Sequence, residues 1–334
     1  MPEQSKKRVL VTGANGLLGA NIVEQLTKSE DYTPVAMVRK GCDMRSLDGL
    51  EYELFEGNIT DIADLEQAIS GCNFVIHSAA MTAIKGTDFE AFERVNITPT
   101  KNIARICAKH GVRRMVFVST ANCFTNGSLA KPGNELGGFM PWLKKSGYAY
   151  SKLLAQEHIQ EQAWANELNA IVVAPTFMLG SRDAGPSSGT MLLYGLKKRV
   201  VFYPPGGKSF VDVRAVAKAT VTGLTKGESG ELFLLSGENM TYRDFFRTIS
   251  KVSGKRKLLV PVPGAVFGFV SAVSELVGRM SGKKALFDKT NKRLLCLDNY
   301  FSNNKAVASL DMEQTDVESS VEEGMRWFGQ NGYL

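Results

Sequence analysis

The chain has 334 residues, long enough for one α/β domain with a smaller second one. Its composition, 44% hydrophobic and 22% charged, is ordinary for a globular protein, and the net charge of +6 comes without a dense Lys/Arg run of the kind that binds nucleic acid. The five cysteines are odd in number and lack a CxxC pair, which disfavours a disulfide framework or a zinc site and favours a reducing compartment.

The N-terminal sequence and the histidines narrow the expectations further. The chain enters an apolar run within its first ten residues, which leaves no room for a signal peptide, so we expect a cytoplasmic protein. His77, His110 and His158 have no metal-ligand neighbours in the sequence, so we assign no metal site.

The stretch from Arg8 to Lys28, RVLVTGANGLLGANIVEQLTK, predicts a strand, a glycine turn and a helix. Gly13 permits a tight turn, Gly16 lets a pyrophosphate approach the backbone, and Gly19 allows close packing of helix and strand. Because the first N–H groups of such a helix are free to face an anion, the stretch predicts a dinucleotide site.

Strands and helices alternate through the first half of the chain. We predict strands at 33–38, 52–56, 74–77, 115–119 and 170–174, and helices at 61–70, 89–110 and 148–167. This alternation indicates an α/β fold with a Rossmann-type doubly wound parallel sheet, because parallel strands need crossover connections. The segments that follow the strands, 78–80, 119–120 and 175–176, should meet the glycine loop at one edge.

The pattern changes after Pro175. A helix at 210–225 and a strand at 231–235 are predicted to rejoin the sheet, and the remainder is predicted to be mainly helical. We therefore expect an NAD(P)-binding Rossmann domain over 1–180 with 209–236 returning to it, and a substrate-binding region over 181–208 and 237–334. The apolar stretch 262–280 predicts a packing helix, with a lipid-facing or substrate-entry helix as the alternative.

Tyr148 and Lys152 lie four residues apart and therefore share one face of the predicted helix. A phenol has a pKa near 10, and a nearby ammonium lowers it toward the range useful for proton transfer. Ser119 and Thr120 end the preceding strand, where a hydroxyl can donate to a substrate carbonyl. Together these residues predict proton-transfer chemistry at the edge of the sheet.

Arg39 directly follows the second predicted strand. An acidic residue there would bind the ribose 2′-hydroxyl of NAD, whereas an Arg accommodates the 2′-phosphate of NADP, with Arg45 as a possible assistant. Asn58 and Ile59 follow the third strand, where an amide could hydrogen-bond adenine or simply form a turn. Arg39 therefore favours NADP, with NAD as the alternative.

With TGANGLLG at 12–19, then Ser119-Thr120, then Tyr148-xxx-Lys152, the chain resembles the short-chain dehydrogenase/reductase superfamily. Its length and later segments are similar to the extended branch, the NAD-dependent epimerase/dehydratase family, and within it to bacterial dihydroflavonol-4-reductase-like members. The further segments that carry this resemblance are 95–97, 174–176, 210–213 and 327–333.

The resemblance implies roles for individual residues. Tyr148 would be the catalytic acid/base, Lys152 would lower its pKa and hold the nicotinamide ribose, and Thr120 would polarise the substrate carbonyl. It also implies a homodimer. The residues implied to bind the cofactor are Gly13, Asn15, Gly16, Leu17, Leu18, Arg39, Asn58, Ile59, Ala79, Ala80, Tyr148, Lys152 and Pro175.

The expected activity is an NADP-dependent oxidoreduction that moves a hydride between nicotinamide and a small-molecule carbonyl or alcohol. One alternative is a sugar-nucleotide epimerase or dehydratase that holds NAD and returns the hydride to the same molecule. Another is a sterol oxidoreductase similar to 3β-hydroxysteroid dehydrogenase. A cofactor-binding protein without catalysis is the remaining alternative, which the Thr120, Tyr148 and Lys152 set disfavours.

Overall fold

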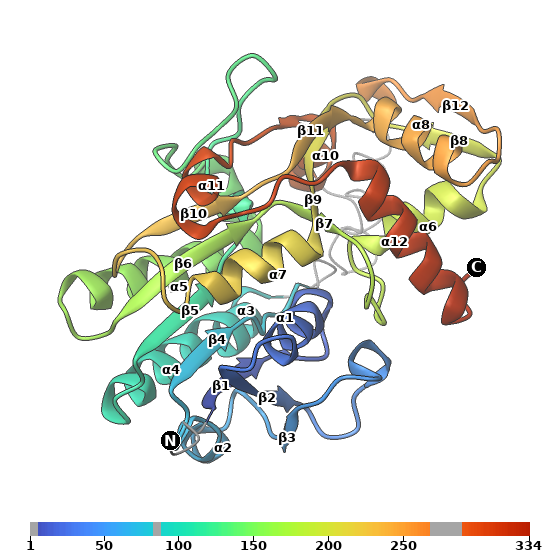
Figure 1. Ribbon diagram of the computed structural model, residues 1–334. Coiled ribbons are helices and arrows are strands. Elements are labelled where there is room, and N and C mark those ends of the chain that lie inside the picture. Colours follow the sequence, from blue (N-terminus) through green and yellow to red (C-terminus); the bar gives the residue numbers. More distant parts are fainter. Residues whose placement is uncertain (1–5, 83–87, 268–288) are drawn as a thin grey trace.

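A parallel sheet forms the centre of the molecule (Figure 1). The computed structural model describes residues 6–82, 88–267 and 289–334, and within these ranges the sheet has seven strands in the order β10-β6-β5-β4-β1-β2-β3, all paired in parallel. The strands are β1 (Lys7–Thr12), β2 (Tyr32–Val38), β3 (Glu53–Glu56), β4 (Phe74–His77), β5 (Arg114–Val118), β6 (Ala170–Pro175) and β10 (Leu232–Leu235). The strand order reverses at β1 and β4, which confirms the predicted Rossmann-type sheet.

Helices cover both faces of this sheet (Figure 1). Alternate strand residues point to opposite faces, so Val9 and Val11 join one buried cluster while Leu10 joins the other. One face is covered by α1 (Leu17–Thr27), α7 (Val213–Thr222) and α11 (Asn304–Leu310), and the other by α2 (Ile62–Ile69), α4 (Thr98–Lys109) and α5 (Gly147–Trp164).

The helix predicted over 89–110 is built from three pieces. It comprises α3 (Phe89–Phe92), a π-helical turn (Glu93–Ile97) and α4. Asn96 lies in this π-helical turn, and its side chain is buried in the protein. Short 3₁₀ turns lie at Arg45–Leu47, Ala121–Cys123 and Pro141–Lys145.

The second part of the chain adds helices and two small sheets around a third buried cluster, in which Phe210 and Phe245 stack with ring centroids 4.2 Å apart. The helices are α6 (Gly189–Lys197), α8 (Tyr242–Val252), α10 (Lys289–Cys296) and α12 (Val317–Gln330). One sheet contains β7 (Phe177–Leu179), β9 (Gly207–Asp212), β11 (Glu238–Thr241) and β13 (Asp298–Asn299), and the other pairs β8 (Val200–Tyr203) with β12 (Leu258–Pro261).

The helix predicted over 210–225 begins later than expected. Phe210 belongs to β9, and α7 starts only at Val213 because Asp212 caps it by accepting a 2.7 Å hydrogen bond from the Arg214 backbone N–H. The strand predicted over 231–235 is confirmed as β10, which pairs with β6. These two elements rejoin the central sheet as expected.

Most of the apolar stretch 262–280, with the helix predicted for it, lies outside the described residues. Within the described part of the chain, no helix is long and apolar enough to cross a bilayer.

Candidate active site

The glycine loop between β1 and α1 is tightly packed at the carboxyl edge of the sheet. Gly13 has a φ of 68°, and a Cβ there would lie 2.8 Å from the Ala79 Cα. A Cβ on Gly19 would lie 2.2 Å from the Gly13 carbonyl oxygen, which is closer than any side chain tolerates. The tight turn at Gly13 and the close helix–strand packing at Gly19 are therefore both confirmed.

The start of α1 offers a place for an anion. Gly16 is the N-cap residue, exposed and extended, and the first turn of α1 contains no acidic side chain. The N–H groups of Leu17 and Leu18 belong to this first turn, where an α-helix has no internal acceptors for them. The loop thus fits the pyrophosphate that the sequence predicts, because backbone donors and the helix dipole both favour negative charge.

The loop that follows β2 packs against the glycine loop. Asn15 donates from Nδ2 to the Asp43 carbonyl at 3.1 Å, and Ser46 donates to the Asn15 carbonyl at 2.8 Å. Arg39 is exposed at the end of β2, and within the described residues its guanidinium makes no hydrogen bond or ion pair. Arg45 differs, because its guanidinium is paired with the Asp43 carboxylate at 2.6 Å.

Tyr148 and Thr120 come together at the same edge. Thr120 follows β5, and Tyr148 lies in the first turn of α5, which Ser146 caps by accepting a 3.3 Å hydrogen bond from the Ala149 N–H. The half-buried Tyr148 phenol lies near the Thr120 side chain, which acts to lower the pKa of the phenol. The structure therefore assembles the phenol and the hydroxyl that the sequence singled out.

Lys152 is buried near Tyr148 and Thr120, but its ammonium does not point at the phenol as the sequence led us to expect. Its Nζ donates to the Val118 carbonyl at 2.5 Å and sits 4.1 Å from the centroid of the Phe117 ring. Burial lowers the pKa of Lys152 to about 7, because an ammonium loses hydration there.

The pKa of Tyr148 also departs from expectation. We expected Lys152 to lower it, but burial raises the pKa of Tyr148 to about 12, opposed only by the nearby Thr120 side chain. The expected lowering is wrong for this state of the protein, because the ammonium is directed at a backbone carbonyl and desolvation of the phenolate dominates.

Ser119 and Thr120 have different surroundings. The buried Ser119 hydroxyl donates its proton to Gln156 Oε1 at 2.6 Å, so this proton is already used in a hydrogen bond within the protein. Gln156 was not predicted, although its spacing from Tyr148 and Lys152 at successive four-residue steps places it on the same face of α5. Thr120 is thus the hydroxyl that remains beside Tyr148.

Two buried polar side chains anchor the site and were not predicted to do so. The His77 Nδ1 lies 2.7 Å from Thr12 Oγ1, and its Nε2 lies 2.9 Å from Thr100 Oγ1, so this histidine is not isolated as the sequence suggested. Asn96 accepts from the Met81 N–H at 2.7 Å and donates to Ser151 Oγ at 2.9 Å, which ties the segment after β4 to α5.

The remaining predicted cofactor residues lie at or near the same edge. Ala79 and Ala80 follow β4, and Pro175 ends β6. Asn58 follows β3, where its Oδ1 accepts from the Thr60 N–H at 3.1 Å, so its side chain forms a turn. Ile59 packs against the buried cluster beneath. The Tyr150 ring packs beside this site, with its centroid 5.4 Å from that of the Phe89 ring.

The arrangement is chemically suited to moving a proton. A neutral phenol beside a hydroxyl can donate toward a substrate oxygen, and an amine with a pKa of about 7 nearby can gain or lose a proton at neutral pH. The compressed glycine loop supplies the cradle for a dinucleotide.

Comparison with known proteins agrees with this geometry. The model of the NAD dependent epimerase/dehydratase family matches residues 9–235. A Synechocystis sp. protein named as a dihydroflavonol 4-reductase is 25% identical over 97% of this chain and 95% of its own length. Sterol demethylase protein B of Methylococcus capsulatus is 25% identical over 97% of this chain and 99% of its own.

A solved structure is also similar over the whole molecule. The crystal structure of gox2253 superposes with a TM-score of 0.87 and 26% identity, covering 98% of this chain and 100% of the other. The family match spans more than half of the chain and includes the glycine loop, Thr120, Tyr148 and Lys152. The chain therefore belongs to the NAD-dependent epimerase/dehydratase family, in the extended branch of the short-chain dehydrogenases/reductases, and is an NAD(P)-dependent oxidoreductase.

Proposed function

We propose that the protein is an NADP-dependent reductase of a small-molecule carbonyl, acting reversibly on the corresponding alcohol. The observation that carries this proposal is that Tyr148 and Thr120 lie near each other at the edge of the sheet where the glycine loop lies. The bound nicotinamide would supply or accept the hydride.

The proton would move through Tyr148. With its pKa raised to about 12, the phenol is protonated at neutral pH and is ready to donate to the carbonyl oxygen as that oxygen gains negative charge. Thr120 would hold the same oxygen by a hydrogen bond. Lys152, with a pKa of about 7, could return a proton to the phenolate or balance its charge.

Exchange of Tyr148→Phe tests this role. We expect the turnover number to fall about 10²- to 10⁴-fold, because the ring stays and only the donated proton is lost, while the affinity for NADPH stays nearly unchanged. The assay follows the loss of nicotinamide absorbance with NADPH and a panel of aldehydes, ketones and sterols.

Tyr150→Phe is the matched control, because it removes a phenol hydroxyl two residues away on a ring that packs against Phe89. We expect it to retain wild-type turnover. Near-normal turnover by Tyr148→Phe would show that another group transfers the proton.

The choice of NADP rests on Arg39. This exposed guanidinium follows β2, beside the loop that packs on the glycine loop, and makes no ion pair within the described residues. It could therefore meet a 2′-phosphate without breaking an existing contact. Arg45 is less available because its guanidinium is already paired with the Asp43 carboxylate.

The homodimer and the division of the chain into a cofactor-binding domain and a substrate-binding region stay predictions.

Two alternatives remain, each with its own observation. The family includes epimerases and dehydratases by name, and such an enzyme would retain NAD on purification and show no net nicotinamide turnover. The relative named sterol demethylase protein B favours a sterol among the substrates of an oxidoreductase. Net NADPH loss with a ketone but not with sterols would exclude both.

A further inference from the structure

Two basic triplets meet at one end of the small β8–β12 sheet. Lys197, Lys198 and Arg199 immediately precede β8, and residues 255–257, Lys-Arg-Lys, immediately precede β12. The two strands are parallel, with Leu258 beside Val200, so both triplets lie at their shared starting end. Six cations are thus brought together from segments almost sixty residues apart.

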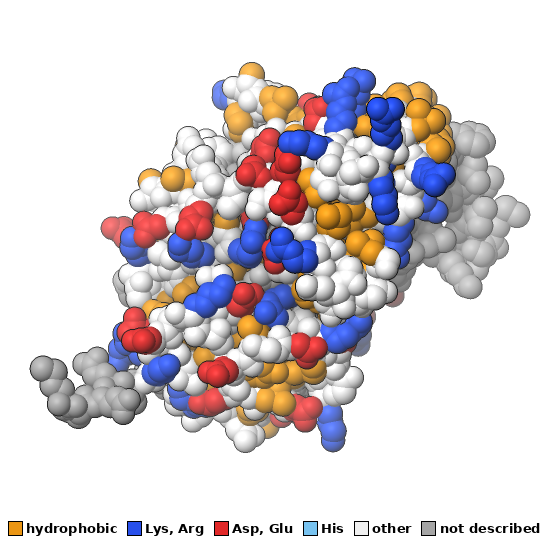
Figure 2. Space-filling model, turned by 45° about the vertical axis from the view of Figure 1, so that its right-hand side comes forward, with side chains coloured by type: hydrophobic (Ala, Val, Ile, Leu, Met, Phe, Trp, Pro, Cys, Tyr) orange, Lys and Arg blue, Asp and Glu red, His pale blue; other side chains and the backbone are white. Residues whose placement is uncertain are grey.

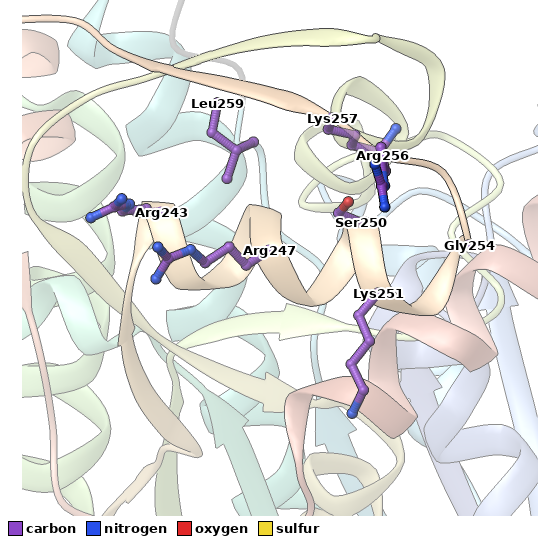
Figure 3. A pocket seen from close by; sticks show the side chains of 8 residues that line it. All are labelled: Arg243, Arg247, Ser250, Lys251, Gly254, Arg256, Lys257 and Leu259. Atoms are coloured by element: carbon purple, nitrogen blue, oxygen red, sulfur yellow. The ribbon is translucent and has the colours of Figure 1, made fainter.

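A surface pocket of about 590 Å³ continues this positive region along α8 (Figure 3). Figure 3 shows Arg243 and Arg247 on α8, Arg256 and Lys257 in the turn that follows, and Leu259 on the strand above. The other lining residues are Ser250, Lys251 and Gly254.

The positive charge of this region is only partly balanced. Arg247 pairs with Asp244 at 3.2 Å, and Lys251 pairs with Glu318 at 2.6 Å. Arg243 and Arg256 make no ion pair within the described residues, and Lys197, Lys198 and Arg199 make none either. An anion is therefore the natural complement of this surface.

Apolar side chains are exposed beside these cations. Leu258 is 64% exposed, Phe202 is 55% exposed and Val200 is 41% exposed, whereas Val201 between the last two is fully buried. Alternation along the paired strands places these three side chains on the outer face of the sheet, opposite Val201 and Leu259, which pack toward α8. Figure 2 shows hydrophobic atoms among Lys and Arg side chains at the upper right, over α8, β8 and β12.

We propose that this basic and apolar surface, formed by the outer face of β8 and β12 and by the two triplets at its end, docks the enzyme on an anionic phospholipid bilayer. Lipid headgroups offer phosphates to the cations, and the layer beneath accepts exposed leucine and phenylalanine side chains. A soluble polyphosphate or a nucleic acid would match the cations but leave Leu258 and Phe202 in water. Long Lys and Arg side chains can reach phosphates while the apolar face sits deeper.

Vesicle co-sedimentation of the full chain tests the proposal. We expect binding to vesicles that contain phosphatidylserine, little binding to pure phosphatidylcholine, and a loss of binding as salt rises. The triple variant Lys198→Gln, Arg199→Gln and Arg256→Gln should weaken binding about 100-fold, which corresponds to about fivefold for each cation.

A second triple variant, Lys101→Gln, Arg105→Gln and Lys131→Gln, removes the same charge from exposed positions elsewhere and should bind vesicles as the wild type does. Leu258→Ser should weaken binding about tenfold, whereas Leu136→Ser, at a side chain 93% exposed outside this surface, should not. NADPH-dependent activity, or the far-ultraviolet circular dichroism spectrum, would verify that each variant is folded.

Three results would overturn the proposal. One is an absence of binding to phosphatidylserine vesicles at low salt, and another is an equal loss of binding in the two triple variants. The third is binding of tripolyphosphate or RNA by the wild type without vesicle binding, which would assign the cations to a soluble polyanion.

Discussion

Among single residues, Arg39 is the side chain that we propose to separate the two nicotinamide dinucleotides. It is exposed after β2 and carries no competing ion pair within the described residues. We expect Arg39→Ser to raise the Kd for NADPH tenfold or more and to leave the Kd for NADH nearly unchanged, because a charge-assisted hydrogen bond is worth about 1.5–3 kcal/mol. Fluorescence titration of each cofactor measures both constants.

Lys40→Ser is the control for this change, since Lys40 is the neighbouring exposed cation. It should leave the preference for NADPH close to that of the wild type. An equal loss of NADPH affinity in the two variants would mean that general positive charge, and not a specific contact of Arg39, attracts the phosphate.

Between elements, His77 connects strands β1 and β4 with helix α4 through Thr12 and Thr100. Thr100 donates its own hydroxyl proton to the Asn96 carbonyl at 2.6 Å, so the network assigns the proton of a neutral imidazole to Nε2. Burial lowers the pKa of His77 to about 3, because a charged imidazole would lose its hydration.

This shift predicts a loss of stability in acid. Between the unfolded pKa of 6.5 and the folded value of about 3, the unfolded chain binds a proton that the folded chain does not, so the free energy of unfolding falls as pH decreases. From pH 7 to pH 4 the contribution of His77 should fall by about 3 kcal/mol. Urea unfolding at both pH values measures this change.

His77→Gln removes the titration while keeping a donor and an acceptor, so its stability should change less between pH 7 and pH 4 than that of the wild type. His110→Gln is the control, because His110 lies at the surface beside Glu66 at 2.6 Å. If His77→Gln and the wild type lose the same free energy in acid, other groups cause the acid sensitivity.

At the scale of the whole molecule, cofactor binding should stabilise the fold that forms its site. A ligand that binds only the folded chain, present at one hundred times its Kd, stabilises it by about 2.7 kcal/mol. We therefore expect NADPH to raise the unfolding temperature of the wild type by about 4 °C in a thermal scan.

Gly19→Ala should abolish this shift, because its Cβ would lie 2.2 Å from the Gly13 carbonyl oxygen and would force the glycine loop to move. Gly138→Ala is the matched control, since a Cβ there meets nothing within 4 Å. A normal NADPH shift in Gly19→Ala would place the pyrophosphate away from the glycine loop.

The sequence alone was sufficient for the central sheet and for placing Thr120 and Tyr148 at one edge of it. Apolar runs and helical spacing are local properties, so the strands from β1 to β6 and the glycine loop could be predicted from them. Thr120 and Tyr148 could be placed together because the carboxyl ends of parallel strands share an edge.

Only the tertiary structure decided the environment of those residues. Three contacts join groups that are distant in sequence. They are the hydrogen bonds of neutral His77, the hydrogen bond from Ser119 to Gln156, and the hydrogen bond from the Lys152 ammonium to the Val118 carbonyl. The pKa of Tyr148 rises because of burial, and burial depends on what surrounds a group in three dimensions. Local patterns therefore identified the candidate groups, and long-range packing set their protonation and partners.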